Sequence, residues 1–146
     1  MAAERPDAQL VLKHMGVVRE ALGELPFPDR VRVVGHVDYE QMAAYYRVAD
    51  VCVSIASSDS APRSVFEAMA CGTPCVLSDL PWVHEQIGEG REALIVPIER
   101  TAVAGAIRRL LDDPGEIAVR ARALVERHHD AAVHMDRLAD AYRTLL

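Results

Sequence analysis

The stretch SSDSAPRSVFEAMACGTP (Ser57–Pro74) carries most of what this sequence reveals about its fold. The run before it, Val51–Ile55, is apolar and uncharged, which predicts a buried strand. A polar loop follows, and then a helix is expected over about Ser64–Ala70, because Gly72, Thr73 and Pro74 end the helical pattern. A strand, a loop and a helix in this order predict the α/β fold class.

The same alternation extends to both sides of this stretch. Strands are predicted at Gln9–Lys13, Val31–Val34, Val51–Ile55, Cys75–Leu77 and Ala93–Val96, and helices at Val17–Leu25, after Asp38 and at Trp82–Ile87. After Pro97 only helical patterns occur. Right-handed crossovers would place these elements in a Rossmann-like, three-layer domain with a parallel sheet of about five strands, followed by an all-helical segment over residues 99–146.

The loop before the 64–70 helix is the predicted ligand site, because open parallel sheets bind ligands where strands end and helices begin. A helix that starts near Arg63 and Ser64 offers N–H groups and a partial positive charge, which suit a phosphate. Arg63 could add a bidentate cation. Glu67, one turn further, could accept hydrogen bonds from ribose hydroxyls, and Asp59 could turn toward the same crevice.

A structural interpretation of the same residues stays open. Ser64 to Glu67 fits a capping box, in which Glu67 reaches back to the start of the helix. Asp59 could hold an Asx-turn. Taken one at a time, these residues favour the structural interpretation, and only the pattern of the whole stretch favours a binding site.

That pattern resembles group 1 glycosyltransferases, which are retaining, nucleotide-sugar-dependent enzymes with two Rossmann-like domains, the GT-B architecture. The resemblance rests on Asp59 and Glu67, two acids separated by seven residues, and on the Glu-Ala-Met-Ala-x-Gly-x-Pro helix end at Glu67–Pro74. It extends from about Pro6 to Leu146, and the stretches that agree with it are Ala49–Val51, Arg30–Val37 and Leu80–Gly90.

The resemblance implies roles by position. Glu67 corresponds to the acid that binds the nucleotide ribose and Asp59 to the acid that contacts the donor sugar, so these two are the catalytic candidates. Asp59 departs from the Glu that is usual there, and Ala93 stands where Gly is common. The donor-binding residues implied are Gly35, His36 and Val37 in the loop beside the base, Ser60 and Pro62, the diphosphate cradle Arg63, Ser64 and Val65, and Glu67. The resemblance implies no metal and no cofactor, since the substrate is a UDP- or GDP-type nucleotide sugar.

A departure from the family lies at the start of the sequence. Family donor domains begin with a strand and a helix that carry Gly-Arg and Lys-Gly cations, and no such residues precede Pro6. Residues 1–146 are therefore expected to form a partial C-terminal GT-B donor domain that lacks the first βα unit. The missing strand is central in the order 3-2-1-4-5-6, so its absence would leave unpaired edges that favour pairing with another chain.

The expected function is binding of a nucleotide-diphosphate sugar for transfer of the sugar to an acceptor hydroxyl with retention. The alternative is a catalytically incomplete remnant that acts as a nucleotide-binding or protein-interaction module. Expected partners are the nucleotide sugar and an acceptor-binding domain or second chain, with a homo-oligomer as one form of the latter.

Composition excludes several other classes of protein. The chain has 146 residues and a formal net charge of −6, from 16 Lys and Arg against 22 Asp and Glu, which argues against a nucleic-acid partner. No apolar run approaches the ~20 residues that a transmembrane helix needs. The odd number of cysteines, Cys52, Cys71 and Cys75, indicates buried thiols of a cytoplasmic protein. The His-rich segment from His128 to His134 is interpreted as part of a solvated helix rather than a metal site.

Overall fold

The computed structural model describes residues 5–13 and 28–145. These residues fall into two compact units, Met1–Met42 and Ala43–Leu146. The predicted helix at Val17–Leu25 lies outside the described residues.

The first unit contains a parallel pair of strands. Strand β1 (Leu10–Lys13) pairs with β2 (Val31–Val34) in a register that sets Leu10 beside Val31. A short 3₁₀ turn, η1 (Pro28–Arg30), leads into β2. Helix α2 (Tyr39–Val48) begins in this unit, directly after the Asp38 position that the sequence assigned to its start.

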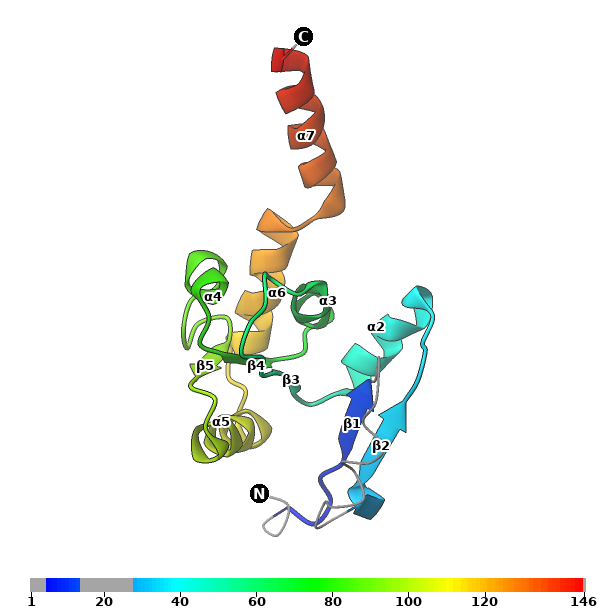
Figure 1. The fold of residues 1–146 in the computed structure, drawn as a ribbon, viewed down its shortest axis with the longest axis vertical. Helices are drawn as coiled ribbons and strands as arrows, with labels where there is room; N and C mark the ends of the chain where they lie inside the picture. Colours follow the sequence, from blue (N-terminus) through cyan, green and yellow to red (C-terminus); the bar gives the residue numbers. More distant parts are fainter. Residues whose placement is uncertain (1–4, 14–27, 146) are drawn as a thin grey trace. The chain divides into compact units, whose positions relative to one another are not determined.

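The second unit is a three-stranded parallel sheet with its crossover helices (Figure 1). The strands lie in the order β3 (Cys52–Ser54), β4 (Cys75–Ser78) and β5 (Leu94–Val96). The helices are α3 (Arg63–Ala70), α4 (Pro81–Gln86), α5 (Arg100–Asp112), α6 (Ile117–His128) and α7 (Ala131–Leu145). Each predicted strand and helix of this unit is confirmed, with its bounds shifted by one residue or so.

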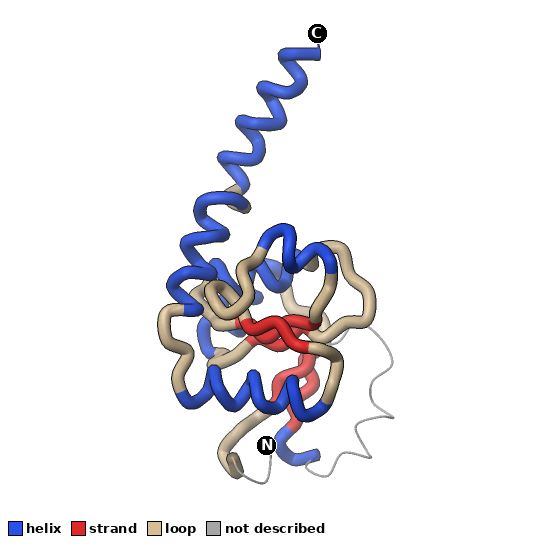
Figure 2. The backbone as a smooth tube through the Cα atoms, turned by 90° about the vertical axis from the view of Figure 1, so that its left-hand side faces the viewer, coloured by secondary structure: helices blue, strands red, loops and turns tan. Residues whose placement is uncertain are grey.

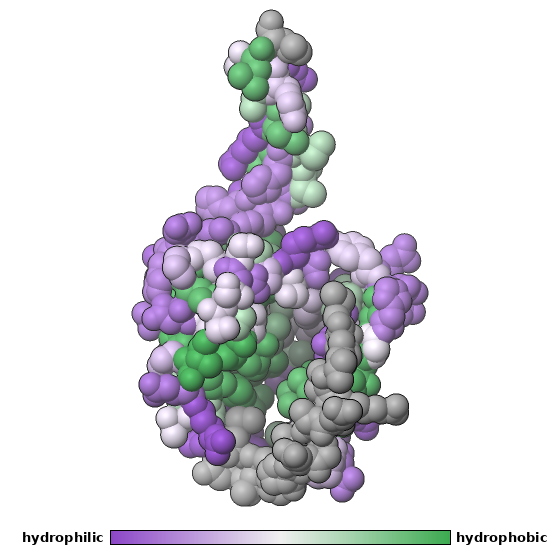
Figure 3. Space-filling model, in the orientation of Figure 1, coloured by the Kyte–Doolittle hydropathy of each residue, from purple (hydrophilic) through white to green (hydrophobic). Residues whose placement is uncertain are grey.

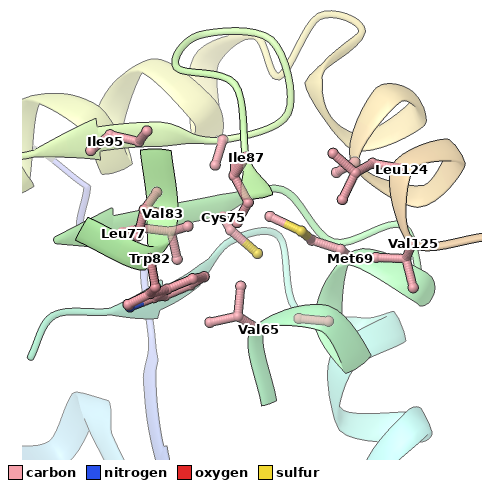
Figure 4. Packing of buried hydrophobic residues seen from close by; sticks show 13 residues of the cluster. Val65, Met69, Cys75, Leu77, Trp82, Val83, Ile87, Ile95, Leu124 and Val125 are labelled. Carbon is pink, nitrogen blue, oxygen red and sulfur yellow. The ribbon is translucent and has the colours of Figure 1, made fainter. Parts of the chain in front are cut away.

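The central strand β4 is buried on both faces, which is typical of a parallel strand covered by helices on each side. On one face, Met69 of α3 extends toward Cys75 of β4, and α4 and α6 complete the cluster (Figure 4). On the other face, Val76 of β4 packs against Leu110 of α5 and Ile117 of α6. Helices α5 and α6 thus bury apolar faces against the sheet and α3.

Helix α3 ends in a Schellman motif, which explains the Gly of the signature. Gly72 has φ of +81°, in the left-handed region that favours glycine. Its N–H donates to the carbonyl of Met69 (2.9 Å), and the N–H of Thr73 donates to the carbonyl of Ala68 (3.0 Å). These two bonds satisfy carbonyls at the helix end and turn the chain back toward β4.

The predicted α/β class with parallel strands is confirmed, whereas the five strands of the described residues form two sheets instead of the single sheet expected. Among the described strands, β1 has β2 as its one partner, and β3 has β4. The strand pattern could not reveal this division, because pairing depends on which strands are neighbours in space.

The last helix, α7, leaves the body of the second unit (Figures 1 and 2). None of its residues is buried, and Met135, Leu138, Tyr142 and Leu145 are exposed on it. Within the described ranges, no helix is both long enough and apolar enough to cross a membrane.

Candidate functional site

The predicted site begins in the loop that joins β3 to α3. This loop, residues 55–62, lies at the carboxyl end of β3, where parallel sheets bind their ligands. Ala61 has φ of +61°, a left-handed conformation that costs roughly 1–2 kcal/mol for a residue other than glycine. Strained backbone of this kind is concentrated at functional sites. Here it directs the chain into Pro62, the extended N-cap of α3.

The N-terminus of α3 has no side-chain cap, and its first turn holds no acidic residue. The capping-box interpretation is therefore wrong. The helix starts at Arg63 with Pro62 as its N-cap, so Ser64 lies inside the first turn instead of capping it. Within the predicted cradle, the N–H of Val65 donates to the carbonyl of Pro62 (3.1 Å), and the Val65 side chain is fully buried. Val65 thus anchors the start of the helix to the core.

Glu67 is held from two sides. The hydroxyl of Tyr46 donates to its Oε2 (3.2 Å), and Nη2 of Arg63 lies 3.8 Å from its Oε1, one helical turn away. The Glu67 side chain is 28% exposed, so it is fixed in place and still reachable from solvent. A carboxylate held in this way can accept hydrogen bonds from a ligand's hydroxyl groups.

Tyr46 contacts the candidate site, although the sequence interpretation did not include it there. Besides contacting Glu67, it accepts a hydrogen bond at its carbonyl from Oγ1 of Thr73 (2.6 Å), so it connects α2 to the middle of α3 and to the turn that follows α3. Burial, and secondly the negative charge of Glu67, raise the pKa of Tyr46 far above its usual value. Its hydroxyl therefore remains a donor. No local signal in the sequence connects Tyr46 with Glu67, which is 21 positions away.

Asp59 and Ser60 make a local contact with each other. The N–H of Ser60 donates to Oδ1 of Asp59 (2.7 Å), and both residues are exposed. This bond agrees with the structural interpretation of Asp59 as a loop residue, although it joins adjacent residues instead of residues two apart. Asp59 and Glu67 both belong to the second unit, on either side of the start of α3.

The predicted base loop, Gly35, His36 and Val37, belongs to the first unit. Val37 is buried. His36 is exposed, with its Nε2 3.6 Å from Oδ1 of Asp38.

Several other side chains have structural contacts. Nε2 of His84 lies 2.6 Å from Oδ1 of Asp79, and Trp82 is a buried core residue. His129 stacks on Phe66 with ring centroids 4.0 Å apart. Burial, and next the neighbouring His134 and His128, lower the pKa of His129. In the part of the chain described here, no group of His, Cys, Asp and Glu side chains could hold a metal ion, and the thiols of Cys52, Cys71 and Cys75 are free.

Two surface hollows lie away from these residues. One, of about 490 Å³, lies between the end of α5 and the start of α6 and includes Arg109 and Arg120. The other, of about 320 Å³, lies between β5 and α5. Neither is lined by any residue that the sequence assigned to the site.

The parallel sheet, the loop after β3 and the acid pair around the start of α3 define a Rossmann-like domain of the GT-B type. Residues 2–113 match the sequence profile described as "Glycosyl transferases group 1". The chain belongs to this family.

Known proteins agree with this assignment. Glycogen synthase of Mycobacterium tuberculosis is 33% identical over 97 residues, which are 66% of this chain and 23% of that protein. Sucrose-phosphate synthase from Thermosynechococcus elongatus superposes with a TM-score of 0.89 and 28% identity, over 98% of this chain and 40% of the other. HepE of Anabaena, in complex with UDP-glucose, shares the fold with a TM-score of 0.84 and 19% identity, over 95% of this chain and 42% of its own. The chain thus spans less than half the length of these proteins.

Proposed function

We propose that this chain binds the nucleotide-diphosphate part of a sugar donor at the start of α3, and that it serves transfer of the sugar to an acceptor hydroxyl with retention. The observation that carries the proposal is the fixed carboxylate of Glu67. It lies one turn inside a helix whose N-terminus has no side-chain cap, next to a strained loop at the carboxyl end of a parallel strand.

In this proposal, Glu67 accepts hydrogen bonds from the two hydroxyls of the ribose. The helix N-terminus at Arg63 and Ser64, together with the Arg63 guanidinium, receives the diphosphate, because N–H groups and a positive helix end favour anions. Asp59, Ser60 and Pro62 lie beside the sugar. Val65 contributes by anchoring the first turn, since its own N–H already has a partner.

The proposed chemistry needs stabilisation of negative charge more than it needs acid or base catalysis. When the bond between the anomeric carbon and the diphosphate oxygen breaks, negative charge develops on the leaving diphosphate. The anomeric carbon bonds to the acceptor oxygen, and the acceptor proton passes to the leaving diphosphate. Donors fixed before the reaction stabilise such charge without reorganisation. The start of α3 would supply part of this stabilisation.

Calorimetric titration of the purified chain with UDP and with GDP tests the proposal. Glu67→Ala should weaken binding at least about tenfold, because hydrogen bonds to a charged group contribute roughly 1.5–3 kcal/mol. Glu67→Gln, which still accepts from Tyr46, separates the loss of charge from any disturbance of α3. Glu126→Ala is the matched control, since Glu126 is exposed on α6 and pairs with Arg122.

Equal affinity in Glu67→Ala and the unchanged chain would disprove the ribose role. No binding of either nucleotide would disprove the proposed function as a whole.

We also propose that residues 1–146 act as part of a C-terminal donor domain, with acceptor binding supplied elsewhere. The relatives are more than twice as long as the part that this chain matches, which supports the proposal that another part binds the acceptor. The two separate sheets favour the second candidate function, a nucleotide-binding or interaction module without turnover. Hydrolysis or transfer of a nucleotide sugar by the chain alone would decide against that candidate.

A further inference from the structure

Two cysteines lie side by side on β3 and β4. The register of these parallel strands sets Cys52 directly beside Cys75. Their Cα atoms are therefore about 4.8 Å apart, which is the spacing of neighbouring strands. A disulfide needs a Cα separation of roughly 4.4–6.8 Å. The pairing of the two strands thus brings these cysteines within the range that a disulfide requires.

Both thiols lie on the face of the sheet that α3 covers. Residues in register on neighbouring parallel strands direct their side chains to the same face. Cys75 belongs to the buried cluster that contains Met69 of α3, and Cys52 packs against the same cluster. Figure 4 shows the sulfur of Cys75 directed from β4 toward α3. The two sulfur atoms therefore share one region of the core, as a bond between them needs.

The surroundings of this cysteine pair are apolar. The cluster consists of aliphatic, aromatic and sulfur-containing side chains. Apolar atoms also gather on the surface over the strands of the second unit (Figure 3). Because moving a charged molecule into such surroundings is costly, a small uncharged oxidant reaches the thiols more readily than a charged one. Hydrogen peroxide is an oxidant of this kind.

The two thiols differ in acidity. Sγ of Cys75 lies 3.5 Å from the carbonyl of Thr73, to which its S–H can donate. The same S–H can donate to the sulfur of Cys52, and this hydrogen bond lowers the pKa of Cys52. That hydrogen bond, and next burial, raise the pKa of Cys75. Since the thiolate is the nucleophilic form, Cys52 is the thiol that attacks an oxidant first.

We propose that Cys52 and Cys75 form a redox site, at which a peroxide joins the two thiols in a reversible disulfide. The Cys52 thiolate attacks one peroxide oxygen, the O–O bond breaks, and the departing hydroxide takes a proton to become water, which leaves a sulfenic acid on Cys52. The sulfur of Cys75 then attacks the sulfur of Cys52. The S–S bond forms, the S–O bond breaks, and the hydroxide leaves as water with the proton of Cys75. The two thiols together lose two electrons, and the peroxide is reduced to two molecules of water.

The disulfide would enclose the segment that carries the candidate site. The loop 55–62 and helix α3 lie between Cys52 and Cys75 in the chain. A bond between the starts of β3 and β4 restricts the conformations of that segment. Cys75 would also lose the proton that it can donate to Thr73, whose hydroxyl donates to the carbonyl of Tyr46. The redox site and the candidate site therefore share structural elements, although formation of the bond requires no nucleotide.

Mass spectrometry of the folded chain after treatment with hydrogen peroxide tests the proposal. All three cysteines are free thiols before treatment. The oxidised chain should be lighter by two hydrogen atoms and should keep one thiol that reacts with iodoacetamide. A proteolytic digest should contain Cys52 and Cys75 in one cross-linked pair of peptides. Dithiothreitol should restore all three thiols.

Cys71→Ser is the matched control, because it removes the third thiol and keeps the pair. It should form the same disulfide and retain no reactive thiol, whereas Cys52→Ser and Cys75→Ser should form no disulfide within the chain. A treated chain without a bond between Cys52 and Cys75, or with a bond that involves Cys71 or joins two chains, overturns the proposal. If Cys75→Ser does not fold, the digest of the unchanged chain decides by the same criterion.

Discussion

Replacing Tyr46 by Phe removes the hydroxyl that donates to Glu67 and leaves the ring in place. Hydrogen bonds to charged groups contribute roughly 1.5–3 kcal/mol. The O···O distance of 3.2 Å is longer than the ~2.5–3.0 Å that is usual for a hydroxyl donor, and Glu67 is partly solvated. We therefore expect the free energy of unfolding to fall by about 1 kcal/mol, which is roughly 3–5 °C in Tm for a chain of this size.

Urea unfolding at pH 7 measures this loss. Tyr45→Phe is the matched control: Tyr45 precedes Tyr46 on α2, and its hydroxyl makes no hydrogen bond within the described residues. A loss in Tyr46→Phe no greater than in Tyr45→Phe would refute the argument that Tyr46 holds Glu67.

The raised pKa of Tyr46 gives a second readout. The folded pKa lies above the unfolded value of about 10, so its contribution to stability is complete below pH 10 and is lost as pH rises through the folded pKa. Absorbance of the phenolates should show one of the four tyrosines ionising later than the others. That late step should disappear in Tyr46→Phe. Its persistence would assign the perturbation to another tyrosine.

Two further predictions concern stability. Gly72→Ala should lower the free energy of unfolding in urea by about 1 kcal/mol or more, because φ is +81° at this position. Gly105→Ala lies inside α5, where an added Cβ meets open space, and should raise it by about 0.5–1 kcal/mol. Equal effects of the two substitutions would contradict the Schellman argument. His129 has a folded pKa below its unfolded value of about 6.5, so its contribution to stability is present above pH 6.5 and is lost as pH falls through the folded pKa. His129→Phe, which keeps an aromatic ring on Phe66, should therefore lose less stability between pH 7.5 and pH 5 than the unchanged chain or His128→Phe. An equal loss in all three proteins would contradict this prediction.

The sequence predicted the second unit well because its signals are local. The apolar runs at residues 51–55, 75–77 and 93–96 each became a strand, and Gly72 ended α3 as expected. The family could be identified from the same stretch, because the acid pair and the helix end are adjacent in the chain. The number of sheets could not be predicted from the strands alone, since strand pairing depends on which strands are neighbours in space.

Local sequence patterns predicted some features of the candidate site, and the tertiary structure determined the others. The sequence by itself determined that Asp59 and Glu67 lie on either side of a helix start after a buried strand, because residue type, spacing and helix-ending residues act over a few positions. Only the tertiary structure decided that Glu67 contacts Tyr46 of α2 and that the described strands form two sheets. Each of these depends on contacts between segments far apart in the chain, and such contacts are selected by packing of the whole unit, which no local pattern encodes.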